Sequence, residues 1–250
     1  MTTSGPLPSA TPALAAYLLG TVEFESALAL QQRLVFDASG ESIGQATLLL
    51  CEHPALITIG RQGSRADIDV SAEELAQRRI DVRWVNRGGG TVLHLPGQLA
   101  IYPVVPLEHL GWTPGQYLER FQTAVQAALA DVGVTALPQA DRAGLWTRNG
   151  LMVAIGVAIK AGVSYFGAYL NVDVPIASIR RIRTDPVTRA PLTSLSVERR
   201  RGVRMPAVRE AVVRHLASTF GPDRYHIYSR HPLLVRKSIS APSENTLRAP

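Results

Sequence analysis

The chain of 250 residues is 46% hydrophobic, which is enough to enclose one substantial core. It has no run of about 18 apolar residues that would span a bilayer, and its first residues lack the basic region of a secretory signal, so we expect a cytoplasmic protein with no membrane partner. The net charge of +6 fits an acidic protein partner, nucleic acid, or a solvated face without a partner. The single cysteine, Cys51, excludes a disulfide framework and a cysteine metal site, and its apolar surroundings favour an inert core thiol.

Two flanking segments differ in composition from the rest of the chain. Residues 1–13 are rich in Ser, Thr, Pro and Ala, and residues 229–250 form a basic, polar segment, so both are predicted to be flexible tails. They enclose one expected domain at residues 14–228. Arginines are concentrated late in that domain, in SIRRIRTD (178–185) and VERRRGVR (197–204). Because no helix-turn-helix, zinc-finger or aromatic RNA-binding motif accompanies them, we rank an acidic protein partner above nucleic acid and expect no nucleic-acid partner.

Hydrophobic periodicity predicts the elements of the first half of the domain. A helix over residues 22–35 has an apolar face that Gln31 interrupts. A short helix after Ser71 begins with a capping box, in which Ser71 and Glu74 exchange hydrogen bonds with the backbone. Short β-like runs lie at residues 46–51, 55–60, 82–85, 90–95 and 98–105.

The clearest helix of the sequence follows these strands. Thr113 is its N-cap, Pro114 occupies the first helical position, Gln116 completes a capping box, and Gly133 ends the helix. Its buried stripe is expected to contain Leu118, Phe121, Val125, Ala128, Leu129 and Val132.

Strands joined by tight turns dominate the later part of the domain. The dipeptides Asn149-Gly150 and Ala161-Gly162 mark two of these turns. A last helix is expected between Pro206 and Gly221. Helices mixed with hairpins favour a mixed α/β (α+β) fold over a strictly alternating parallel one.

Three consecutive glycines, Gly88 to Gly90, stand between Arg87 and His94 in NRGGGTVLHLPGQLAIYP (86–103). Glycine permits φ > 0 and lets a ligand approach backbone amides. Arg87 would pair with an anion, and His94 would donate to, or exchange a proton with, a carbonyl group. The alternative is a tight glycine turn with a surface arginine and a hydrogen-bonded histidine. The spacing matches neither the dinucleotide motif nor the P-loop.

The stretch RGGGTVLHLPGQLAIYPVVPL (87–107) closely resembles the signature of octanoyltransferases, also called lipoate-protein ligase B, within the lipoate and biotin protein ligase superfamily. The resemblance covers roughly residues 18 to 198, with several independent motifs in order. These motifs are LGTVEFESALALQQRLV (19–35), LLLCEHPALITIGRQG (48–63), AIGVAIKAGVSYFGAYLNVDV (154–174) and LTSL (192–195).

This resemblance implies a fold of the lipoate and biotin protein ligase type, with mixed sheets flanked by helices and a tunnel for a medium-length acyl chain. It implies transfer of octanoyl or a related acyl group from acyl carrier protein to a lysine of a lipoyl domain, in dehydrogenase complexes or glycine-cleavage protein, without a cofactor. The implied substrate-binding residues are Arg87, Gly88, Gly89, Gly90, Thr91, Val92, Leu93, His94, Ala154, Ile155, Gly156, Gly167, Ala168 and Tyr169.

The resemblance also implies a cysteine that accepts the acyl group and a lysine that lowers the pKa of its thiol. Here Leu151 stands at the lysine position, Asp185 at the cysteine position, and Phe166 where a histidine is usual. Lys160 lies nine positions beyond Leu151, which is far along a strand. The remaining catalytic candidates are Asp185, as nucleophile or general base, and the hydroxyl of Thr184, against the reading of both as ordinary loop residues.

Two functions remain open at this point. The first is a divergent acyltransferase that works by direct transfer or with a replacement nucleophile. The second is a pseudoenzyme without activity that binds an acyl group or a lipoyl domain.

Overall fold

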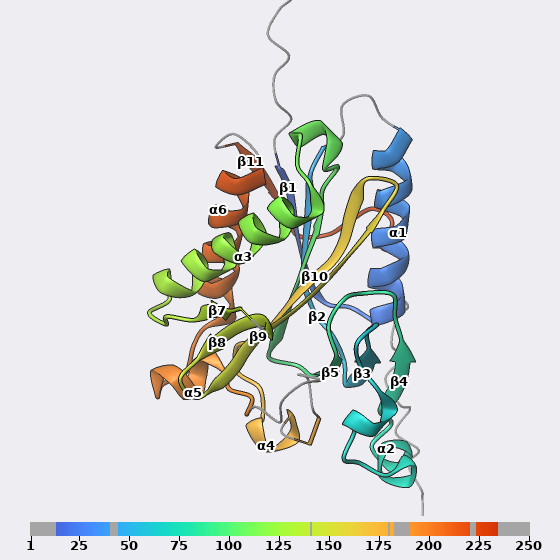
Figure 1. Cartoon of the computed structure of the whole chain (residues 1–250), viewed down its shortest axis with the longest axis vertical. Coiled ribbons are helices and arrows are strands. Elements are labelled where there is room, and N and C mark those ends of the chain that lie inside the picture. Colours follow the sequence, from blue (N-terminus) through green and yellow to red (C-terminus); the bar gives the residue numbers. More distant parts are fainter. Residues whose placement is uncertain are drawn as a thin grey trace, which may run out of the picture.

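Two β-sheets of unequal size form the centre of the fold (Figure 1). The computed structural model describes residues 14–40, 45–140, 142–179, 181–182, 191–220 and 224–234. The large sheet has the strand order β11-β1-β2-β6-β10-β9-β8-β7, and the small sheet has the order β4-β3-β5. The large sheet is made of β1 (Leu14–Thr21), β2 (Thr47–Glu52), β6 (Gln98–Val104), β7 (Leu137–Gln139), β8 (Arg142–Thr147), β9 (Gly150–Lys160), β10 (Val163–Asn171) and β11 (Tyr225–Tyr228). The small sheet is made of β3 (Leu56–Ile59), β4 (Asp81–Trp84) and β5 (Thr91–His94).

Parallel and antiparallel pairs occur in both sheets. β1 runs parallel to β2 and to β11, and β3 runs parallel to β4, whereas β6, β8, β9 and β10 pair with their neighbours antiparallel. The helices are α1 (Phe24–Gly40), α2 (Ala72–Gln77), α3 (Pro114–Asp131), α4 (Ile176–Ile179), α5 (Leu195–Arg199) and α6 (Met205–Phe220), with single 3-10 turns at Arg65–Asp67 and Glu108–Leu110. The mixed α/β architecture predicted from the sequence is therefore confirmed.

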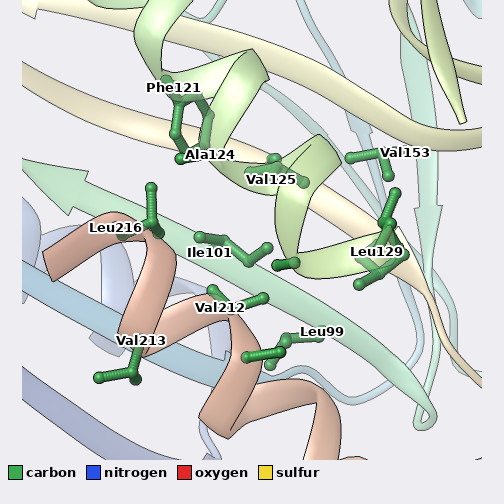
Figure 2. Close-up of a cluster of buried hydrophobic side chains, with 14 of the residues drawn as sticks. Leu99, Ile101, Phe121, Ala124, Val125, Leu129, Val153, Val212, Val213 and Leu216 are labelled. Atoms are coloured by element: carbon green, nitrogen blue, oxygen red, sulfur yellow. The ribbon is translucent and has the colours of Figure 1, made fainter. Parts of the chain in front are cut away.

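The large sheet is covered on both faces. α3 and α6 pack on one face, where their apolar side chains interdigitate with those of β6 and β9 (Figure 2). α1 covers part of the other face through a second cluster that contains Phe24, Leu30, Tyr102 and Phe166. The small sheet closes the rest of that face through a third cluster that includes Ile59, Leu151 and Leu192. The space between the two sheets is therefore lined by the second and third clusters, away from α3 and α6.

Helix α3 forms as its sequence predicts. The Thr113 side chain accepts from the amide of Gln116, the Gln116 side chain accepts from the amide of Thr113, and Pro114 fills the first turn. The expected stripe is buried except for Leu118, which is only partly covered. Tyr117, which was not expected in the stripe, is also fully buried.

The capping box predicted for α2 is only half present. The Ser71 hydroxyl accepts from the amide of Glu74, as expected. The Glu74 carboxylate instead forms ion pairs with Arg78 and Arg181. Charge-assisted hydrogen bonds to two arginines stabilise this carboxylate more than one bond to the cap amide would. Through its ion pair with Glu74, Arg181 connects α2 to the segment after α4.

The predicted tails meet the folded domain at different points. β1 begins at Leu14, directly after the first predicted tail. Two residues near the start of the second contact the domain, since His231 is buried with its ring 4.6 Å from that of Tyr17 and Leu234 packs against the cluster under α1. No helix in the part of the chain that the structure describes is long and apolar enough to cross a membrane.

Candidate functional site

The glycine loop between β4 and β5 packs directly on strand β9. The amide of Gly88 donates to the carbonyl of Val157 at 3.0 Å, and Gly89 has a φ of 76°. A Cβ at Gly156 would overlap the Gly88 carbonyl, and a Cβ at Gly60 would overlap that of Gly89. The glycines thus allow backbone to approach backbone, which differs from the expectation that they expose amides to a ligand.

Arg87 points into the protein and not to solvent. Its side chain is 1% exposed, and its Nη2 donates to the hydroxyl of Thr58 at 2.8 Å and to the Thr58 carbonyl at 3.2 Å. The guanidinium lies 5.4 Å from the centre of the Tyr169 ring. Burial lowers the pKa of Arg87, and the nearby tyrosines oppose that shift. Among the described residues no carboxylate pairs with it, so hydroxyl, carbonyl and ring interactions balance the charge.

His94 is fully buried. Its Nε2 lies 2.9 Å from the Thr58 hydroxyl and its Nδ1 2.9 Å from Oε1 of Gln98, so both ring nitrogens are occupied. Burial, together with His53 and Arg87, lowers the pKa of His94 well below its usual 6.5, and the ring is neutral at pH 7. These two hydrogen bonds agree with the interpretation of a hydrogen-bonded histidine, and a role of His94 toward a substrate carbonyl stays a prediction.

A second buried histidine was missed in the sequence. His53, directly after β2, binds the Val22 carbonyl through Nδ1 at 2.7 Å and the Tyr102 hydroxyl through Nε2 at 2.8 Å. Cys51 lies beside it with its sulfur 3.7 Å from Nε2, and burial raises the pKa of the Cys51 thiol. The thiol is fully covered, which agrees with the inert core cysteine expected from the sequence.

Strand β9 carries one extra residue opposite β8. Leu145 pairs with Val153, but the next residue, Trp146, pairs with Leu151, so Met152 is a β-bulge. Met152 and Val153 both face α3 and α6, whereas Leu151 turns to the other side of the sheet. Strict alternation would have placed Leu151 on the same face as Val153. The bulge therefore directs position 151, the proposed lysine position, toward the space between the sheets.

That space contains a small cavity. Its lining consists of Val92, Leu93, Gln98, Leu151, Ala154, Tyr169, Asn171 and Leu192. Its volume is about 10 Å³, which is close to the minimum for a single water molecule. An octanoyl chain is many times larger, so side chains of this lining have to move before such a chain enters.

The predicted acyl-binding residues divide between two faces of the large sheet. Val92, Leu93, Ala154 and Tyr169 line the cavity, with Arg87 and His94 directly behind Tyr169. The side chains of Ile155 and Ala168 lie on the opposite face, in the cluster under α3 and α6. These two residues pair across β9 and β10, and alternation along a strand sends their side chains away from the cavity.

The remaining glycine-loop and strand positions have other neighbours. The Thr91 hydroxyl donates to Asp67 at 3.0 Å, which fastens β5 to the turn after β3. Gly167 pairs with Gly156 across β9 and β10, and a Cβ at Gly167 would overlap the Ile101 carbonyl. These positions bring the elements together and contribute no side chain to the cavity lining.

Phe166 does not close the cavity. It is 1% exposed, lies in the cluster under α1, and is absent from the cavity lining. Its φ of 56° is unusual for a bulky residue, and its amide donates to Oε1 of Gln31 at 2.7 Å. Gln31, which interrupts the apolar face of α1 in the sequence, is therefore a buried anchor for β10.

The structure describes only some of the proposed catalytic residues. Thr184 and Asp185 lie outside the described residues. Lys160 is exposed at the far end of β9, where it pairs with Val163. The chain resumes beside Leu151, whose amide donates to the carbonyl of Pro191 at 2.9 Å. Within the described ranges, no group of three or more His, Cys, Asp and Glu side chains could hold a metal ion.

Comparison with solved structures identifies the fold. Lipoate-protein ligase A bound with ATP superposes with a TM-score of 0.68 at 18% identity, covering 88% of each chain. A bi-partite lipoate protein ligase from Thermoplasma acidophilum, studied with its E2 lipoyl domain, superposes with a TM-score of 0.65 at 17% identity, over 88% of this chain and 86% of that one. The architecture is that of the lipoate and biotin protein ligases.

Sequence comparison narrows this to a family. The model of the lipoyl protein ligase A/B catalytic domain matches residues 23–217. An octanoyltransferase from Geobacter metallireducens is 38% identical over 196 residues, which cover 78% of this chain and 87% of that protein. The chain belongs to the lipoyl protein ligase A/B catalytic domain family, as its sequence motifs indicate.

Proposed function

We propose that this protein transfers octanoyl or a related acyl group from acyl carrier protein to a lysine of a lipoyl domain. The observation that carries the proposal is the 38% identity to an octanoyltransferase, which spans most of both chains. The bulge at Met152 fits the family arrangement, because it turns position 151, where the resemblance implies a lysine, toward the cavity between the sheets. The lipoyl domain as acceptor is supported by the structural neighbour studied with its E2 lipoyl domain.

The transfer exchanges a thioester for an amide. The acceptor amine attacks the acyl carbonyl carbon, the carbon–sulfur bond breaks, and the proton lost by the amine ends on the departing thiol. We propose direct attack with Asp185 as the general base, or a covalent step on Asp185 or Thr184, as the routes that replace cysteine chemistry. Both routes require side chains of the cavity lining to move before the acyl chain enters.

Acyl carrier protein is proposed as the donor because it is acidic and because exposed arginines lie near the cavity end of the fold. Arg200, Arg201 and Arg204 are exposed after α5, and Leu192 in the cavity lining precedes the same helix. Opposite charges on the two partners would speed association and orient the donor.

Incubation with octanoyl-acyl carrier protein and an unmodified lipoyl domain tests the proposal. Mass spectrometry should show one octanoyl group added to the acceptor lysine, at a rate above a control without the protein. An Asp185→Ala variant should transfer more slowly. Absence of transfer above the control, over a series of chain lengths, would reject the acyltransferase.

A pseudoenzyme that binds an acyl group without turnover is the second candidate. The apolar surroundings of Leu151, which packs with Trp146 and Leu192, favour it. Among the described lining residues there is neither a lysine nor a cysteine. This candidate predicts a bound acyl species in native mass spectrometry and no transfer in the assay above.

A further inference from the structure

Two amide side chains form the polar wall of the cavity, and a continuous chain of hydrogen bonds fixes both. Nε2 of Gln98 donates to Oδ1 of Asn171 at 3.0 Å, and Nδ2 of Asn171 donates to the carbonyl of Thr193 at 3.1 Å. Behind Gln98 the chain continues through His94 and Thr58 to the buried guanidinium of Arg87. It thus runs from a buried cation to the backbone beside Leu151.

Backbone carbonyls settle the orientation of each amide independently. The carbonyl of Leu93 accepts from Gln98 at 3.2 Å, so the amide nitrogen must face Leu93 and Oε1 must face His94. The carbonyl of Thr193 likewise requires the nitrogen of Asn171 on its side, which leaves Oδ1 of Asn171 for Gln98. A flip of either amide would place two acceptors against each other.

At the Arg87 end of this chain of hydrogen bonds, donors and acceptors follow the same order. Since Oε1 of Gln98 only accepts, Nδ1 of His94 must carry the proton, and Nε2 of the neutral ring accepts from the Thr58 hydroxyl. The same hydroxyl oxygen accepts from Nη2 of Arg87, which only donates. Each hydrogen bond thus pairs one donor with one acceptor, and all of them donate in the direction from Arg87 to Thr193.

One hydrogen is left over at the cavity end. Nδ2 of Asn171 carries two hydrogens, and within the described residues one hydrogen bond accounts for one of them, to Thr193. Asn171 is 6% exposed and lines the cavity. A buried N–H donor in such a place is stabilised by an acceptor oxygen. The acyl carbonyl is the acceptor that the proposed substrate brings.

We propose that Asn171 is a catalytic residue whose second Nδ2 hydrogen binds the carbonyl oxygen of the acyl group. The inference rests on the proposed function for the nature of the ligand, an acyl thioester. When the acceptor amine bonds to the carbonyl carbon, the π electrons move to the oxygen, and the fixed N–H stabilises the developing negative charge. The oxygen then re-forms the double bond as the carbon–sulfur bond breaks. An N–H that is held in place before the reaction needs no reorientation during it.

The test measures the infrared band of S-octanoyl-pantetheine labelled with carbon-13 at the carbonyl, bound to the full chain. Bound to the unaltered protein, the carbonyl band should shift to lower frequency than in water-free solvent. In Asn171→Ala the shift should be lost, and transfer should fall by about 100-fold or more at saturating substrate. Thr58→Val is the matched control, because it breaks the same chain of hydrogen bonds away from the cavity while both carbonyls that orient the amides remain. Its band should keep the shift of the unaltered protein.

The outcomes separate this inference from the proposed function. A bound and shifted carbonyl without acyl transfer would reject the acyltransferase and retain Asn171 as the carbonyl ligand. Transfer by the unaltered protein with an equal band shift and rate in Asn171→Ala would overturn the inference and leave the acyltransferase standing. Failure of the thioester to bind, or an unshifted band in the unaltered protein, would also overturn the inference.

Discussion

The side chain of Gln31 on α1 accepts a hydrogen bond from the amide of Phe166 on β10, with an N···O distance of 2.7 Å across 135 positions of sequence. Gln31 is fully buried, and it also donates to the Ala27 carbonyl of its own helix. The bond satisfies the amide of a residue with positive φ one position before Gly167, where β10 pairs with Gly156. A single polar side chain thus connects a helix on one face to the strand behind the cavity.

Replacing Gln31 by leucine should destabilise the protein by about 1–3 kcal/mol, because the buried amide of Phe166 loses its acceptor. The neighbouring Gln32 is exposed on the same helix, and Gln32→Leu should change stability by less than about 0.5 kcal/mol. Urea denaturation of the three proteins measures the difference. Equal stability of both variants would show that the bond contributes nothing.

Stability should decline in mild acid because of the buried histidines. Burial lowers the pKa of His53 to about 4, from its usual 6.5, against the opposing bond to Val22. Between these two pH values the unfolded chain binds a proton that the folded chain does not, so folding is favoured above pH 6.5 and weakens as the pH falls toward 4. His53 alone accounts for about 3 kcal/mol over this range, and His94 shifts in the same direction.

Thermal unfolding between pH 4 and pH 7.5 checks this expectation. His53→Gln should flatten part of the pH dependence, because a titrating group is removed from the core. A stability that is constant from pH 7 to pH 4 would contradict the buried neutral state of His53.

The sequence predicted most of the local structure. The capping residues of α3 and the turn at Ala161-Gly162 rest on interactions within a few residues of each other. What it did not predict depends on distant partners. β1 and β11 pair across the whole chain, Gln31 meets Phe166 only after folding, and the bulge at Met152 is set by the register of β8 against β9.

The inward orientation of Arg87 is another feature that the sequence did not predict. From the sequence it was expected to be a surface residue or an anion ligand, whereas the structure surrounds it with Thr58 and Tyr169. The one local sign was the apolar pattern on both sides of Thr58, which marks a buried strand with a hydroxyl in it. No sequence rule connects that hydroxyl to Arg87, since the two lie 29 positions apart.

The close packing of the glycine loop on β9 should not tolerate a methyl group. Gly156→Ala places a Cβ against the Gly88 carbonyl, so we expect a loss of about 1–3 kcal/mol and weaker acyl binding as the loop moves away. Gly115 in the first turn of α3 has its nearest neighbour for a Cβ at 3.9 Å, and Gly115→Ala should be neutral or stabilising. Calorimetry and acyl binding measure both effects. A fully stable, binding-competent Gly156→Ala would rule out the tight contact.

The arginines after α5 should affect the binding of acyl carrier protein more than the rate of the chemical step. Reversing two exposed charges, Arg201→Glu with Arg204→Glu, should raise KM for acyl carrier protein by about fivefold while kcat changes little. Added salt should likewise raise the KM of the unaltered protein for acyl carrier protein. Arg33→Glu on α1, on the other face of the large sheet (Figure 1), is the control and should leave KM unchanged. Equal KM values in all variants would place the donor elsewhere.

The correspondence of Leu151 and Asp185 to a lysine and a cysteine can be tested by building that pair. In Leu151→Lys with Asp185→Cys, the amine should lower the pKa of the new thiol, and the thiolate should take the octanoyl group from acyl carrier protein. Mass spectrometry should then detect a thioester on the introduced cysteine that hydroxylamine removes. Leu151→Met with Asp185→Cys is the control, because it lacks the amine and keeps the apolar wall of the cavity.

The lysine will cost stability in the cluster with Trp146 and Leu192, so folding is verified first by circular dichroism. A folded lysine–cysteine variant that gains no more thioester than the control would show that these two positions do not meet in the site.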